Sequence, residues 1–167
     1  MRWVVEAIWL CTAVIAYGAY SSTIAIKGMA PVLPIVVVVR VALTNGELAG
    51  NIVGVLCGLL LDVFSLGWFG AGMLVDSLIG FGVGMVGNRI MLESPAARVI
   101  VLFVAAEAHS IGLMITQDLV GPAAVSTLET AIGTGVYTTV AGAAWWGIAA
   151  VVRNNVGWRG IWNVERD

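Results

Sequence analysis

Five ionisable side chains lie within or beside apolar stretches of the sequence and are the residues best suited to chemistry: Arg40, Asp62, Asp76, Glu107 and His109. Ionisable groups inside a bilayer are costly and usually face the protein interior, a water-filled path or another chain. Three interpretations follow: a buried structural ion pair with a hydrated acid at a helix end, a proton or ion relay through Asp76, Glu107 and His109, and a polar contact with a partner's transmembrane helix. We favour the structural pair.

The depth of each group along its expected helix bears on this ion pair. At about 1.5 Å of rise per residue, Arg40 and Asp76 both lie roughly 12–14 Å below the outer membrane face, so the geometry allows them to pair. Glu107 falls near mid-depth and is an alternative partner for Arg40. Asp62 lies near the outer end of its helix, where we expect it to fix a turn or to meet a partner. The true acid partner of Arg40 stays open.

The sequence carries no recognisable catalytic apparatus. Glu107 and His109 are two residues apart and therefore point about 200° apart on a helix, so they cannot form a metal site from one helix alone. There is no His, Cys and carboxylate cluster with metal-ligand spacing, no Gly-x-Ser-x-Gly, no Walker A loop, and no Gly-x-Gly-x-x-Gly after a strand. We expect no catalytic residue, no metal, no cofactor and no enzyme activity.

Two consecutive stretches carry small or polar residues at every fourth position, which places them along one face of a helix. The first stripe is Gly46, Gly50, Gly54, Gly58 and Asp62, and the second is Gly72, Asp76, Gly80, Gly84 and Asn88. In water each interior glycine costs a helix roughly 0.5–1 kcal/mol relative to alanine, whereas in a bilayer small residues let helices approach closely. We expect the stripes to pack within the chain, with contact to a partner as the alternative.

The composition indicates an integral membrane protein. Of its 167 residues, 60% are hydrophobic and 11% are charged, whereas soluble domains average about 45–50% apolar and about 25% charged residues. The net charge of −2 gives no indication of nucleic-acid binding.

The hydrophobic pattern predicts an all-α fold with a single six-helix transmembrane domain over residues 1–152 and a cytoplasmic interfacial tail over residues 153–167. The expected spans cover residues 3–23, 31–43, 47–64, 68–88, 96–116 and 128–152. On this count one side of the membrane holds Arg2, Arg89, Arg98, Arg153, Arg159 and Arg166, and the other side holds only Lys27. Because basic residues favour the cytoplasmic side, both termini are expected to be cytoplasmic.

The order of features from Pro31 to Gly87 resembles one known family. A short helix opened by Pro31-Val32-Leu33-Pro34 is followed by the glycine helix ending in Asp62, by the turn Gly67-Trp68-Phe69-Gly70, and by a second glycine-bearing helix. This order resembles the rod shape-determining protein MreD family of the bacterial inner membrane. The best-matched positions are Gly54, Gly58, Asp62, Gly70 and Gly80.

The resemblance implies a multi-pass, non-enzymatic scaffold subunit of the cell-elongation machinery, acting in rod shape determination and lateral peptidoglycan synthesis. It implies binding to the bitopic protein MreC and, through it, to MreB and the RodA–transpeptidase synthase. The implied fold is a six-helix bundle similar to the S component of energy-coupling-factor transporters. The glycines and Asp62 are then helix-packing or partner-contact residues, and no catalytic residue carries over.

Two other functions compete with the scaffold. One is a substrate-binding subunit of the S-component type in a vitamin transporter, but Ala7, Ala13, Ala16 and Ala19 never fall at the four-residue spacing that such subunits often use for docking. The other is a proton-coupled channel or transporter that uses Asp76, Glu107 and His109.

Overall fold

A computed structural model of the chain describes residues 31–64, 69–89, 94–120 and 128–155. The first expected span, over residues 3–23, and residues 156–167 of the expected tail lie outside this part. The described part is all-α and consists of α2 (Leu33–Asn45), α3 (Glu47–Phe64), α4 (Ala71–Arg89), α5 (Pro95–Val120) and α6 (Leu128–Asn155).

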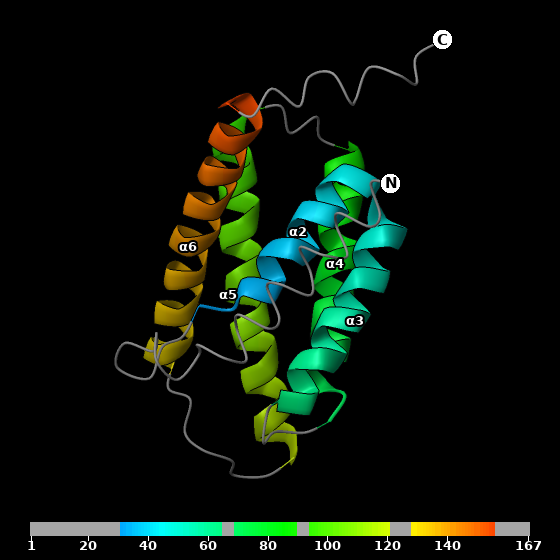
Figure 1. The fold of residues 1–167 in the computed structure, drawn as a ribbon. Coiled ribbons are helices and arrows are strands. Elements are labelled where there is room, and N and C mark those ends of the chain that lie inside the picture. Colours follow the sequence, from blue (N-terminus) through cyan, green and yellow to red (C-terminus); the bar gives the residue numbers. More distant parts are fainter. Residues whose placement is uncertain (1–30, 65–68, 90–93, 121–127, 156–167) are drawn as a thin grey trace.

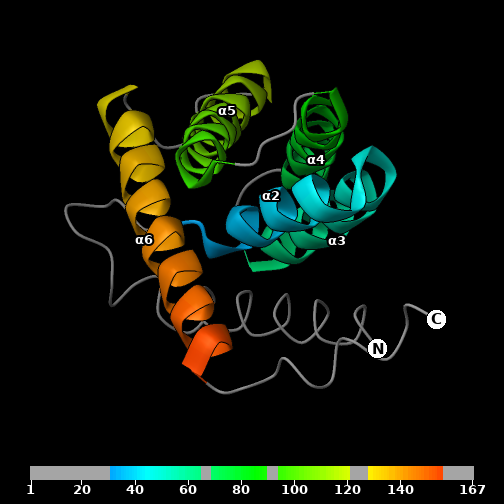
Figure 2. The same cartoon turned by 90° about the horizontal axis from the view of Figure 1, so that it is seen from above.

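Helix α2 is a short helix at the centre of the described bundle. It contacts each of α3, α4, α5 and α6, which form an arc around it in the view from above (Figure 2). Its valine-rich run is apolar on every side, and Ile35–Val39, Val41 and Ala42 are all buried. A helix that is hydrophobic all round belongs in a core.

The length of α2 bears on the expectation of a short second membrane span over residues 31–43. Its 13 residues extend about 20 Å, whereas the hydrocarbon core of a bilayer is about 30 Å thick. The proline-rich start and the turn at Gly46 confine the helix to this length. The apolar run therefore forms a buried core helix that is too short to cross a bilayer by itself.

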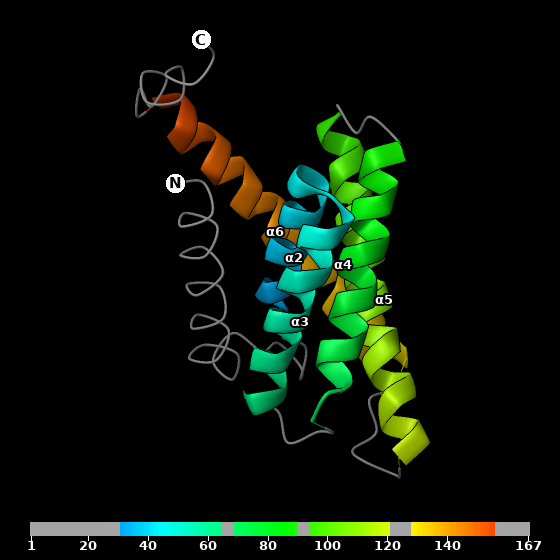
Figure 3. The same ribbon diagram turned by 90° about the vertical axis from the view of Figure 1, so that its right-hand side faces the viewer.

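Three described helices are long and apolar enough to cross a membrane: Glu47–Phe64, Ala71–Arg89 and Pro95–Thr116. Helices α3 and α4 form an antiparallel hairpin on one side of α2, and α5 and α6 lie on the other side (Figure 1). The turned view shows α3 and α4 side by side along most of their length (Figure 3).

The outer faces of the long helices carry large apolar side chains. Exposed examples are Ile52 and Leu56 on α3, Leu78 on α4, Val104 on α5 and Val140 on α6. A water-soluble protein rarely exposes so much contiguous apolar surface, whereas a lipid environment favours it. The fold therefore fits a membrane protein whose glycine-bearing faces point inward and whose bulky aliphatic faces point outward.

Candidate functional site

The glycine stripes of α3 and α4 face each other and bring the two backbones into contact. A methyl group added at Gly54 would overlap the carbonyl group of Asp76, one at Gly58 would overlap that of Gly72, and one at Gly50 would overlap the carbonyl oxygen of Gly80. Only hydrogen fits at these three positions of α3, because each neighbour is backbone and cannot rotate away.

The contact continues to the open end of the hairpin. A methyl group at Gly84 would overlap the backbone of Glu47, and one at Gly80 would overlap the backbone of Gly50. Gly46, between α2 and α3, has a φ of 87°, which glycine adopts without strain. Its N–H donates to Ala42 O at 3.0 Å and so closes the end of α2.

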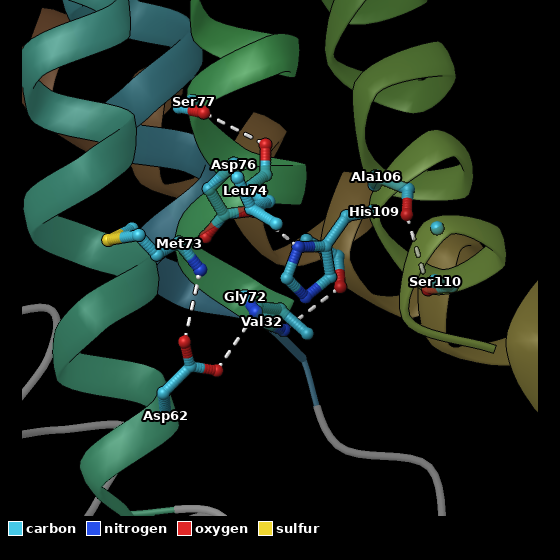
Figure 4. A network of polar contacts seen from close by, with 12 residues as sticks. Val32, Asp62, Gly72, Met73, Leu74, Asp76, Ser77, Ala106, His109 and Ser110 are labelled. Carbon is cyan, nitrogen blue, oxygen red and sulfur yellow. Dashed lines mark hydrogen bonds and ion pairs between the residues drawn. The ribbon is translucent and has the colours of Figure 1, made fainter. Parts of the chain in front are cut away.

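Asp62, at the end of α3, caps the beginning of α4. Its Oδ1 accepts a hydrogen bond from Gly72 N at 2.9 Å, and its Oδ2 accepts from Gly70 N at 2.9 Å and Met73 N at 3.1 Å. The carboxylate is buried, and Figure 4 shows it directed at the first turn of α4. Since the first N–H groups of a helix lack partners within it and carry partial positive charge, Asp62 stabilises this turn both by hydrogen bonding and by charge.

Two further side-chain bonds join α3 to α4. Asn51 Nδ2 donates to Ser77 O at 3.2 Å near the middle of the hairpin. Asn88 Nδ2 donates to Glu47 Oε2 at 2.7 Å at the open end. With Asp62 at the turn, the hairpin is thus fastened by side chains at both ends and between them.

Asp76 pairs with His109 of α5. The carboxylate Oδ1 and the imidazole Nδ1 are 2.5 Å apart, and both side chains are buried (Figure 4). The other carboxylate oxygen, Oδ2, has no hydrogen-bond partner in the described part of the chain.

The depth estimate allowed Asp76 to pair with Arg40, but Asp76 pairs with His109 instead. Val38 of α2 lies against Gly80 of α4, and Asp76 is one helical turn before Gly80. Asp76 thus lies closer to the start of α2 than Arg40 does. Depth counted separately from each helix start could not show this, because α2 is short and begins inside the bundle.

Glu107 lies at a different interface, between α5 and α6. A methyl group at Gly135 of α6 would overlap the Glu107 carboxylate, and the Oε1 atom of Glu107 is buried without a hydrogen-bond partner in the described region. His109 and Glu107 thus point to opposite neighbours of α5, as the 200° separation predicts. Asp76 and Glu107 do not converge on one site, and the described residues hold no group of three His, Cys, Asp or Glu that could bind a metal ion.

One cap was missed by the sequence reasoning. The Thr138 hydroxyl of α6 accepts a hydrogen bond from Val32 N at 3.0 Å and donates to Thr134 O at 2.7 Å. The start of α2 is buried, and a buried N–H without a partner is costly. A short apolar helix that begins inside a bundle requires such a cap, but the sequence contains several threonines in this region and does not indicate which one supplies it.

The arrangement joins helices by backbone contact, by two caps supplied from other helices and by one buried acid–imidazole pair. It is suited to holding a small bundle in one geometry inside a bilayer, where backbone polar groups must be satisfied within the protein.

The comparison with known families agrees with the resemblance and extends it. The family model described as rod shape-determining protein MreD matches residues 1–149, well beyond the Pro31–Gly87 segment on which the sequence resemblance rests. No curated protein and no solved structure matches the chain.

Proposed function

The chain belongs to the rod shape-determining protein MreD family, and from that premise we propose that it is a non-enzymatic scaffold subunit of the machinery that builds the lateral wall of rod-shaped bacteria. The family is one of membrane-embedded, shape-determining structural proteins. In this proposal the chain sits in the inner membrane with both termini in the cytoplasm and holds a bitopic, MreC-like protein, through which it acts with MreB and the RodA–transpeptidase synthase.

The observation that carries the proposal is the α3–α4 hairpin. Its backbones touch at Gly50, Gly54 and Gly58, and the start of α4 is held by the three bonds to Asp62. A scaffold needs a rigid shape more than it needs a reactive group. Asp62 is engaged in a helix cap and Asp76 with His109 in a helix contact, which supports this role over a transport pathway.

The proposed fold of the whole chain is a six-helix bundle, similar to the S component of energy-coupling-factor transporters, in which residues 3–23 supply the remaining helix. The five described helices support this proposal only in part, because α2 is a short central helix.

Co-purification from native membranes tests the proposed role. The tagged full-length chain, extracted in mild detergent, is expected to recover a bitopic MreC-like protein in near-stoichiometric amount, identified by mass spectrometry. A preparation that is folded and monodisperse yet never contains such a partner would contradict the scaffold proposal. Tight binding of a vitamin in a calorimetric screen would favour the S-component-type function instead.

A further inference from the structure

Glu107 is placed near the middle of the membrane. It lies roughly 18 Å along α5 from Pro95 at about 1.5 Å per residue, within the apolar span Pro95–Thr116. Its carboxylate rests on Gly135 of α6, where any larger residue would displace it. The acid is therefore held in the groove between two helices and does not reach toward the aqueous face.

The carboxylate of Glu107 differs from those of Asp62 and Asp76 in its partners. Asp62 accepts three backbone N–H groups and Asp76 is bonded to His109. The Oε1 atom of Glu107, by contrast, is buried and has no hydrogen-bond partner in the described part of the chain. A polar group in hydrocarbon without a partner costs several kcal/mol. Oε1 is closed off between the helices, so a donor from outside the described chain can reach Glu107 only at the part of the side chain that is exposed.

The residues around Glu107 open toward lipid. Val104 and Ile111 lie one turn before and after it on the same face of α5, and Ile132 and Val136 flank Gly135 on α6. All four are exposed, and Glu107 itself is partly exposed. We call these five residues, Val104, Glu107, Ile111, Ile132 and Val136, the Glu107 seam.

We propose that the Glu107 seam is the docking site for a transmembrane helix of the partner, and that this helix places a hydrogen-bond donor side chain against the Glu107 carboxylate. The inference rests on the proposed function and names the surface through which the chain would bind its partner. The partly exposed carboxylate at mid-depth carries it, because lipid tails offer no donor and headgroups lie at the membrane surface, about 15 Å from mid-depth. Hydrogen bonds between polar side chains are a common means of joining membrane helices.

The glycine stripes do not compete for this role. Gly50, Gly54 and Gly58 are covered by α4, so a partner helix cannot enter that groove. The outer face of α3, represented by Ile52 and Leu56, is exposed and apolar and serves as the control surface.

Site-specific photocrosslinking in native membranes tests the docking site. A benzophenone amino acid replaces Ile111 or Val136 in the seam, or Ile52 or Leu56 on α3 as controls. We expect the seam positions to capture the transmembrane segment of the bitopic partner, with the adduct identified by mass spectrometry and containing a donor residue at mid-depth. Capture of that partner from the α3 positions instead, or of a segment without a donor, would overturn the inference and leave the scaffold role standing.

Substitution of the acid gives a second measurement. Glu107→Leu removes the acceptor without stranding a charge, so the variant is expected to elute as a folded particle while recovering about tenfold less partner, equivalent to about 1.4 kcal/mol. Glu107→Gln keeps an acceptor oxygen and is expected to lose less than about threefold. Full recovery by a folded Glu107→Leu protein would overturn the inference. Absence of partner from the unchanged protein as well would overturn the scaffold proposal itself.

Discussion

Asp62 joins two helices with one side chain, because the carboxylate at the end of α3 accepts three N–H groups at the start of α4. Replacing Asp62 with alanine leaves one buried and two partly buried donors without their acceptor, and we expect a loss of about 1–3 kcal/mol in unfolding free energy. Asp62→Asn keeps one acceptor oxygen, so its loss of unfolding free energy should be smaller than that of Asp62→Ala. Thermal unfolding in lipid nanodiscs compares the stability of the unchanged protein and the two variants.

Asn88→Ala is the matched control for Asp62, since it removes an exposed bond to Glu47 at the other end of the hairpin and should cost less than about 1 kcal/mol. An Asp62→Ala protein that unfolds at the temperature of the unchanged protein would show that the cap contributes nothing.

The Asp76–His109 pair is expected to show strong thermodynamic coupling. Removing either partner leaves the other polar group buried alone, whereas removing both leaves neither. A double-mutant cycle of Asp76→Ala and His109→Ala should therefore give a coupling of about 1–3 kcal/mol. The cycle of Asp62→Ala with His109→Ala is the control, because these residues share no bond, and it should be additive within about 0.5 kcal/mol. Equal coupling in the two cycles would contradict the pairing.

At the scale of the helices, glycine is required only where a backbone lies opposite. A methyl group at Gly54 meets the backbone of Asp76, whereas one at Gly82, on the same hairpin, meets nothing within 4 Å. We expect Gly54→Ala to cost at least about 1–3 kcal/mol through overpacking and Gly82→Ala to be neutral. The yield of monodisperse protein and its unfolding temperature compare the two. Equal behaviour of the variants would mean that the backbones do not touch.

The sequence predicted the elements of this hairpin but not all of its geometry. The four-residue spacing and the short turn place Gly50, Gly54 and Gly58 on a face available for close packing. The sequence alone does not predict that these glycines contact α4, because two stripes on adjacent helices can equally face a partner. That contact depends on how the helices pack. The pairing of Asp76 with His109 depends on how α4 and α5 are rotated, which spacing within one helix cannot specify.

The position of α2 shows a second limit of sequence reasoning. A valine-rich run is equally consistent with a membrane span and with a buried core helix, and length decides between them. The Thr138 cap on Val32 shows that this helix begins inside the protein. Such a cap comes from more than a hundred residues away in the chain and leaves no local pattern to detect.

At the scale of the molecule, the basic residues predict the orientation in the membrane. Arg89 ends α4 and Arg98 lies in the first turns of α5, so this end is expected to be cytoplasmic and the α3–α4 turn to face outward. In a background with Cys11 and Cys57 replaced by alanine, Phe69→Cys should react with a membrane-impermeant maleimide in intact spheroplasts. Ala96→Cys should react only after lysis. The reverse pattern would place the termini outside.

Cell shape tests most directly the central claim that the rigid α3–α4 hairpin underlies shape determination. A rod-shaped bacterium whose shape depends on this chain would carry Gly54→Ala or Gly82→Ala as its sole copy, with membrane abundance measured alongside the ratio of cell length to width. We expect rods with Gly82→Ala and rounded cells with Gly54→Ala. Normal rods with Gly54→Ala at unchanged abundance, or rounded cells with Gly82→Ala at that abundance, would contradict the account.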